Sequence, residues 1–520
     1  MGNKYQNNQI FELYKPLRNH LRQVSLQESL YVLWAYIQYL QFDKLLPSDI
    51  TGVPPEILLA ENKIGKRFYE WELEVLIREV IINSQEGDFG TESLRKWNYF
   101  SGAVNKLKEL EDEIDKKFID KTNVLLELHR IGHRQFPWQS KPNREYITRY
   151  FKIFGCSSLD TIIQNVIGLS TQELYLNLMI LFSFYQNKLA LLYPIKIEGI
   201  PEINQETLNK ALDRFSCDLT NLKNRLIKEQ EINERFVYSY SSLRAYPIIA
   251  IKYNGKDSLI CPAPTLLVWR FTSGIFYEIC KEKGFGNEFG KSFQSYTGEV
   301  IGAGNNKVSV YPEKNYYDGK HRKDTVDWIM DENKSALFIE CKAKRISAIA
   351  KAEIKSEEEL KKELDIMADF VVQLYKSIRD YLDNKYPTFK HKKERKIFPL
   401  IVTLEDWYLY GDKLLDELKN KVKEKFKVVG LPLTFLLEMP YSVCSIQDFE
   451  MMVQVMEKVG IKLFMEKKVF DEYKEKWSFF PFITSVFPNE KKDIKFLFPD
   501  DFDKIFPKRF FEEGILNRRE

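Results

Sequence analysis

The hydrophobic and polar positions change their period about halfway along the chain. Before Phe236 the apolar residues recur mainly three or four positions apart, a spacing that predicts helices. The expected helices span residues 10–25, 26–42, 71–84, 95–130, 148–154, 172–193 and 208–236. From about Tyr238 onward, short apolar runs alternate with turn residues and with helical stretches. We therefore expect a helical N-terminal region over residues 1–237 that serves as a scaffold or binds a partner or substrate.

The second half of the chain mixes strands with helices. Two short apolar runs flank Asn254-Gly255, a dipeptide typical of a tight hairpin turn. Further strands are expected over 307–311, 325–330, 336–341 and 397–403, and helices over 266–281, 285–300 and 357–381. The pattern predicts a multidomain α+β protein, with a small α/β extension over residues 411–520.

Three charged residues interrupt two of these apolar strands: Asp327, Glu340 and Lys342. Glu340 and Lys342 share a face, because side chains alternate along a strand. A four-residue turn over 331–334 would place position 330 opposite 335 and position 327 opposite 338, so that Asp327 lies diagonally beside Glu340. Buried like charges are costly unless something compensates for them. Carboxylate oxygens suit Mg²⁺, so a divalent cation is the expected compensation.

The arrangement Asp…Glu-x-Lys on adjacent strands resembles the catalytic core of the PD-(D/E)xK nuclease superfamily. The resemblance implies a restriction-endonuclease-like α/β core, with a central mixed sheet flanked by helices, over residues 238–410. It implies that Asp327, Glu340 and the backbone carbonyl of Cys341 bind Mg²⁺, for which Mn²⁺ substitutes. It also implies that Lys342 is the catalytic lysine. The alternative for these residues is a surface hairpin with a solvated ion pair.

The resemblance assigns roles to two flanking helices. Such nucleases often carry an acidic residue on the helix before the metal strands, and Gln294 stands at the expected position. Glu299 is therefore the candidate carboxylate for catalysis and metal binding, with a solvated helix charge as the alternative. Gln294 and Glu299 are about 140° apart around a helix, so both cannot face one metal. The helix after the metal strands often directs Gln or Lys to the site, which makes Gln373 a candidate.

Basic and aromatic residues are interleaved beside the proposed metal strands. This combination suits phosphate contacts and base stacking, and a solvated loop is the alternative. The candidate nucleic-acid-binding residues are Lys320, Arg322, Lys323, Lys344, Arg345 and Gln373.

Composition and charge limit the domain organisation and the cellular compartment that fit this chain. A chain of 520 residues is long for a single core, and its net charge of +3 means that any nucleic-acid surface is local. The six cysteines form no CxxC pair, so a reducing compartment fits. The N-terminus lacks the apolar core of a signal peptide, and the most apolar stretch, 174–195, carries polar residues. We expect a cytoplasmic protein without a membrane span.

These observations favour a Mg²⁺-dependent nuclease that hydrolyses phosphodiester bonds, with DNA preferred to RNA as substrate. By analogy, such a nuclease acts in bacterial defence against phage or foreign DNA. Two alternatives remain open. One is a catalytically inactive nuclease-fold protein that binds nucleic acid within a larger assembly. The other is an interaction scaffold whose helical region binds a protein partner or a second copy of the chain.

Overall fold

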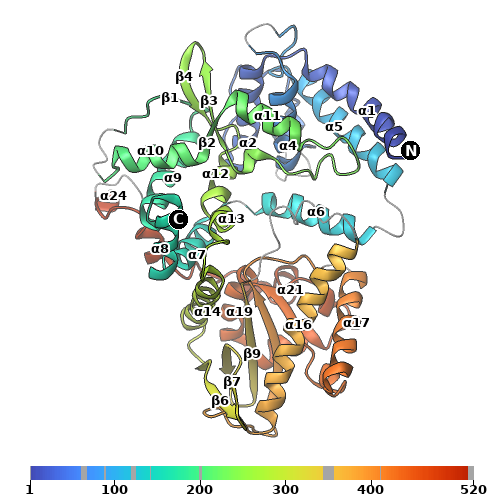
Figure 1. The fold of residues 1–520 in the computed structure, drawn as a ribbon, viewed down its shortest axis with the longest axis vertical. Helices are drawn as coiled ribbons and strands as arrows, with labels where there is room; N and C mark the ends of the chain where they lie inside the picture. The colour runs from blue at the N-terminus through green and yellow to red at the C-terminus, as the bar shows by residue number, and fades with distance from the viewer. Residues whose placement is uncertain are drawn as a thin grey trace.

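The computed structural model describes residues 2–59, 67–86, 90–118, 124–140, 142–197, 202–343, 357–409 and 412–512. Figure 1 shows N-terminal helices at the top and a mixed sheet with its covering helices at the bottom. Helix α6 (Val124–Gln139) lies between these two parts and contacts helices of both. The chain is therefore an α+β protein with a helical N-terminal region, as the sequence pattern predicts.

The N-terminal region is held together by apolar helix faces that pack against one another. Helices α2 and α4 have most of their side chains buried, and α1 and α5 pack beside them. A second group, α7 to α10, packs against the helices that cover the lower sheet. The helices of the region, besides α6, are α1 (Gly2–Leu21), α2 (Leu26–Phe42), α3 (Pro55–Leu58), α4 (Glu70–Asn83), α5 (Trp97–Phe118), α7 (Arg144–Phe154), α8 (Ser157–Ile167), α9 (Thr171–Tyr185), α10 (Gln205–Phe215) and α11 (Leu219–Glu229).

Two of the long expected helices differ from the elements described. The span 95–130 contains all of α5 and the first residues of α6, and residues 119–123 lie outside the described part. The span 208–236 contains α10, strand β2 (Ser216–Asp218) and α11. The break at β2 has two causes: this strand pairs with β3 (Ile248–Tyr253), and the Asp218 carboxylate caps α11 by accepting a 2.9 Å hydrogen bond from the Asn221 N–H.

A four-stranded sheet joins the helical region to the residues after 238. Its strand order is β1 (Ala190–Leu192), β4 (Lys256–Ile260), β3, β2. The β3–β4 turn has positive φ at both central residues, 49° at Asn254 and 74° at Gly255, which confirms the predicted tight hairpin. Because β1 and β2 precede residue 238, this sheet crosses the domain boundary that the sequence places there.

The lower sheet has five strands in the order β11 (Ser442–Ser445), β10 (Lys396–Thr403), β9 (Ser335–Lys342), β8 (Trp328–Asp331), β5 (Ser309–Pro312). Strands β5, β8 and β9 are antiparallel, whereas β10 and β11 run parallel to β9. Strand β11 lies beyond residue 410, so the sheet also crosses the second expected boundary. The basic segment expected to be a loop forms a ribbon, β6 (Asn315–Asp318) and β7 (His321–Asp324).

Strand β9 is covered on both faces. Leu337 and Ile339 belong to the core that contains α14 (Phe285–Gly304) and α19 (Ile446–Val459). Ala336 and Phe338 belong to the core beneath α16 (Glu357–Leu382) and α17 (Asp412–Val429). Figure 1 shows the sheet between α14 on its left and α16 and α17 on its right. Alternation therefore directs Glu340 and Lys342 to the α16 side.

The remaining helices are short and cover the upper end of the sheet or its flank. The expected helix over 266–281 is broken at Thr272, where φ is −98° and ψ is −100°. These helices are η2 (Ser242–Arg244), α12 (Pro264–Phe271), η3 (Ser273–Ile275), α13 (Phe276–Ile279), α18 (Phe435–Glu438), α20 (Ile461–Val469), η4 (Lys474–Lys476), α21 (Phe479–Val486), α22 (Pro488–Lys491), α23 (Pro499–Asp503) and α24 (Arg509–Glu512).

In the described part of the chain, no single helix has the length and apolar character needed to cross a membrane. Helices α8 and α9 pass that test only as a pair bent by 64°. Most side chains of α9 are buried inside the protein.

Gly298 on α14 provides a test of how tightly the helix packs on the sheet. A Cβ at this position would overlap the indole ring of Trp328, whose Nε1 donates a 2.9 Å hydrogen bond to the Gln294 carbonyl. We expect Gly298→Ala to lower the free energy of unfolding by about 1–3 kcal/mol, because the ring is rigid and anchored. Urea denaturation measures the change.

Gly302→Ala on the same helix is the matched control. A Cβ at Gly302 has no neighbour within 4 Å, so we expect alanine to stabilise the helix by up to about 1 kcal/mol. Equal unfolding free energies for the two variants would show that Trp328 does not pack against α14 as described.

Candidate active site

The β8–β9 hairpin brings Asp327 opposite Glu340. Met330 pairs with Leu337, so the expected pairing of position 330 with 335 is wrong by two residues. Extending the observed register places position 327 directly across from position 340. Asp327 therefore faces Glu340 across the strands, and the diagonal placement expected from the sequence is incorrect.

The shift in register arises at the turn. The sequence pattern favours a four-residue turn over 331–334, but the observed turn is centred one residue later, between Asn333 and Lys334. The Glu332 N–H donates a 2.9 Å hydrogen bond to the Ser335 carbonyl, which closes the hairpin. Asn333 adopts φ of 74°, a left-handed conformation that asparagine tolerates better than most residues. Because the turn is centred one residue later than expected, every residue of β8 pairs with a residue two positions further along β9.

Four polar groups meet at the end of β9. Glu340 Oε1 accepts hydrogen bonds from Lys342 Nζ at 2.8 Å and from Gln373 Nε2 at 2.9 Å. Lys342 Nζ also donates to Gln373 Oε1 at 3.1 Å and lies 5.0 Å from the Phe370 ring centroid. Asp327 Oδ2 accepts a 2.6 Å hydrogen bond from the Cys341 N–H. The structure thus brings Asp327, Glu340, Lys342 and Gln373 together.

The two carboxyl groups lie in an environment that disfavours their charge. Glu340 is only 6% exposed. Burial raises the pKa of Asp327, and the negative charge of Glu340 raises it further, while the Cys341 N–H and Lys342 act in the opposite direction. Burial also raises the pKa of Glu340 despite the ion pair with Lys342. Lys342 therefore does not fully compensate the charge of the two carboxylates.

Glu313 is a third carboxylate near the pair that the sequence interpretation did not include. Its N–H donates a 2.8 Å hydrogen bond to the Asp327 carbonyl, and its side chain accepts one of 3.1 Å from Gln294 Nε2. Its charge contributes to the raised pKa values of both Asp327 and Glu340. The sequence feature that could have identified Glu313 is its position directly after strand β5, which is the neighbour of β8.

Glu299 lies elsewhere, which corrects the expectation that it joins the metal ligands. Its carboxylate forms a 2.7 Å ion pair with Lys152 on α7, and about half of its side chain is exposed. On the same helix, Gln294 lies toward Glu313, and Gly298 lies against Trp328. The helical rotation between these positions and Glu299 directs the latter away from Asp327.

The candidate nucleic-acid-binding residues have different surroundings. Lys320 and Arg322 are exposed on the β6–β7 ribbon. Lys323 Nζ donates 2.7 Å hydrogen bonds to Asp318 and to Asp380 on α16, so it fastens the ribbon to that helix. Lys344 and Arg345 lie outside the described residues. Contact of these side chains with nucleic acid stays a prediction.

The site offers carboxylate oxygens as metal ligands, but only a few side chains supply them. In the described ranges, no group of three or more His, Cys, Asp and Glu side chains is arranged to hold a metal. Asp327 Oδ1 and Glu340 Oε2 accept no hydrogen bond from any described residue. Two such oxygens suit a Mg²⁺ or Mn²⁺ ion that keeps water in most of its coordination positions. A role for the Cys341 carbonyl stays a prediction.

Comparisons of the chain with protein-family models, with curated proteins and with solved structures found no match.

Asp327→Asn tests the buried charge by its effect on stability. Because the pKa of Asp327 is raised in the folded protein, the folded state holds a proton that the unfolded chain releases above its ordinary carboxyl pKa of about 4. This contribution to stability is lost as the pH rises through the folded pKa. In EDTA, we expect the advantage of the variant in unfolding free energy to grow by at least about 1 kcal/mol between pH 5 and pH 8.

Asp369→Asn, a largely exposed carboxylate on α16, is the control. We expect Mg²⁺ to raise the unfolding temperature of the wild-type protein and not that of Asp327→Asn. An advantage of Asp327→Asn that stays constant with pH would contradict the buried-charge assignment. An equal rise in unfolding temperature with Mg²⁺ for the wild-type protein and for Asp327→Asn would contradict the cation site.

Proposed function

We propose that this protein is a Mg²⁺-dependent nuclease of the PD-(D/E)xK type. The observation that carries the proposal is the convergence of Lys342 and Gln373 on Glu340, with Asp327 directly opposite. The order of the surrounding elements supports it. Helix α14 precedes the antiparallel strands β5, β8 and β9, and helix α16 leads to the central parallel strand β10. This is the order of helices and strands that the resemblance implies.

The proposed chemistry assigns a role to each side chain. A divalent cation held by Asp327 and Glu340 would act as a Lewis acid toward the scissile phosphate. Lys342 orients the attacking water or a phosphate oxygen by hydrogen bonding. The Glu340 and Gln373 side chains each hold the Lys342 ammonium, which limits where it points. Gln373 therefore positions the lysine, and Phe370 covers one side of it.

We propose DNA as the substrate and defence against foreign DNA as the biological setting. The net charge of +3 over the whole chain places nucleic-acid contacts on local surfaces, such as the exposed Lys320 and Arg322 of the β6–β7 ribbon. One observation favours a second candidate function. Gln294 replaces the expected helix carboxylate, and Glu299 does not substitute for it. A nuclease fold that binds nucleic acid without cleaving it would have such a site.

Cleavage of supercoiled, linear and single-stranded DNA and of RNA, in Mg²⁺, Mn²⁺ or EDTA, tests the proposal. We expect metal-dependent products from the wild-type protein. We expect Lys342→Ala to lose at least about 100-fold in rate, because it removes the positioned ammonium. Gln373→Ala keeps the lysine but not its orientation, so we expect a loss of about 10-fold to 100-fold.

Two variants on α14 serve as controls. Lys291→Ala removes a largely exposed lysine, and Glu299→Ala removes the carboxylate that the sequence pattern favoured. Both should cleave at the wild-type rate. Full activity of Lys342→Ala would contradict the proposed site. Nucleic-acid binding without products on any substrate, from folded protein in Mg²⁺ and Mn²⁺, would establish the second candidate instead.

A further inference from the structure

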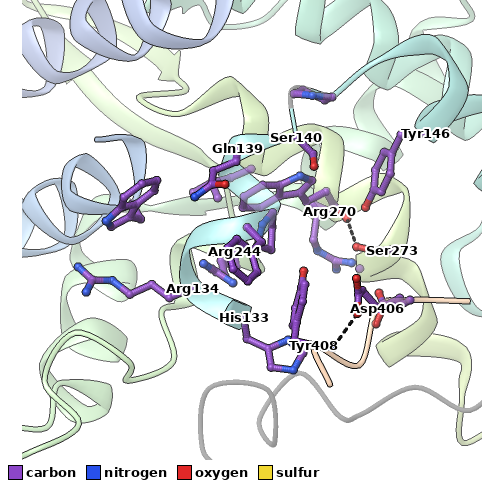
Figure 2. A pocket seen from close by; sticks show the side chains of 18 of the residues that line it. His133, Arg134, Gln139, Ser140, Tyr146, Arg244, Arg270, Ser273, Asp406 and Tyr408 are labelled. Carbon is purple, nitrogen blue, oxygen red and sulfur yellow. Dashed lines mark hydrogen bonds between the residues drawn. The ribbon is translucent and has the colours of Figure 1, made fainter. Parts of the chain in front are cut away.

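A cavity of about 1740 Å³ separates the helical region from the upper end of the lower sheet. Its walls come from α4, α6 and α7, from residues 237–246, from α12 and α13, and from the segments that follow β10 and β11. Figure 2 shows His133 and Tyr146 from α6 and α7, Arg244 and Arg270 from η2 and α12, and Asp406 and Tyr408 from the segment after β10, around one space. The segments that form this cavity lie far apart in the sequence.

The lining is rich in cations and aromatic rings. Nine of its residues are Arg or Lys, six are Asp or Glu, and twelve are Phe, Trp or Tyr. Guanidinium groups lie on several of these rings. Arg130 and Arg134 are 5.9 and 5.8 Å from the Tyr238 ring, and Arg244 is 5.6 Å from the Trp269 ring. A cavity with this lining suits a ligand that is flat and aromatic at one end and anionic at the other.

Two arginines of the lining, Arg214 and Arg270, share one carboxylate partner. A single carboxylate, Glu278, contacts both Arg214 and Arg270. Burial lowers the pKa of Arg270 to about 10, and the neighbouring Arg214 contributes to the lowering. Glu278 balances only one of these two positive charges, so an anion bound beside the guanidiniums would add compensating charge and accept hydrogen bonds from them.

The cavity lies at the carboxyl end of β10, the strand that pairs with β9. Thr403, the last residue of β10, pairs in register with Lys342, the last residue of β9. The residues directly after Thr403, including Glu405 and Asp406, line the cavity. Tyr408 continues this wall, and its ring lies 4.6 Å from the ring of His133 on α6. A ligand in the cavity therefore lies next to the strand ends that carry the candidate catalytic groups.

We propose that this cavity is a nucleotide-binding site, in which the arginines bind phosphate and the tyrosines and tryptophans stack against a base. The same chemistry is presented by an unpaired strand and by a free nucleotide. If the ligand is a strand, the proposal rests on the proposed nuclease function, and the cavity binds the single-stranded segment next to the scissile phosphate. If the ligand is a free nucleotide, the cavity is an effector site between the helical region and the catalytic sheet.

Binding to the full-length protein in EDTA tests the proposal without any cleavage. The probes are a fluorescein-labelled 12-residue oligothymidylate and a fluorescent ATP analogue, each followed by anisotropy. We expect at least one probe to bind and the affinity to fall with added salt. We expect Arg244→Ala to weaken that binding by about tenfold or more, because it removes a phosphate donor and the cation beside Trp269.

Arg95→Ala is the matched control. Arg95 resembles Arg244 in side-chain exposure, 35% against 39%, in its pairing with carboxylates, and in its contact with an aromatic ring, Tyr31. It lies outside the cavity lining and should leave binding unchanged. Arg214→Ala, 41% exposed and in the lining, is a second cavity variant for use if Arg244→Ala fails to fold.

The results of these binding experiments distinguish the two possible ligands or overturn the proposal. Binding of the oligonucleotide that unlabelled ATP does not displace assigns the cavity to a strand, whereas binding of the ATP probe that the oligonucleotide does not displace assigns it to a free nucleotide. Failure of both probes to bind at millimolar concentration, or equal affinities of Arg244→Ala and Arg95→Ala, overturns the proposal. Binding in EDTA that depends on Arg244, without cleavage in Mg²⁺, would retain the nucleotide site and remove the nuclease.

Discussion

The candidate site depends on the close approach of two carboxyl groups, Asp327 and Glu340, at the end of an otherwise apolar pair of strands. Neither group can be charged in this environment without compensation, because burial removes water and each repels the other. Lys342 and the Cys341 N–H provide part of the compensation. The divalent cation that we propose for this site would supply the remaining compensation.

The surrounding fold holds this pair in place. Strand β9 is covered on both faces, so its side chains cannot exchange faces without moving a whole row of apolar residues out of the core. Helix α16 contributes to both packing and chemistry. It buries Phe338 beneath its apolar face, and its Gln373 reaches Glu340 and Lys342 at the open end of the strand. The apolar contacts thereby set the position of the polar ones.

The helical region contacts the lower sheet and its covering helices through several elements. Arg149 on α7 pairs with Glu450 on α19, and α6 contacts both α4 and α16. The cavity between them is lined by side chains from both parts. A ligand there would touch the two parts at once, and a change in their relative position would alter the wall next to the strand ends. This arrangement gives the N-terminal half a physical connection to the candidate chemistry.

The local pattern of the sequence determined much of this arrangement. Alternation placed Glu340 and Lys342 on one face, and the helical period predicted α16. The candidacy of Gln373 came from the resemblance to the nuclease superfamily. Tertiary structure decided the rest. The two-residue turn at Asn333 set the register that brings Asp327 opposite Glu340. Packing of α14 on Trp328 turned Glu299 away, strand pairing brought Glu313 near, and the cavity joined residues hundreds of positions apart. Periodicity records which face of an element is buried, but the partner that covers it is chosen by packing between distant segments.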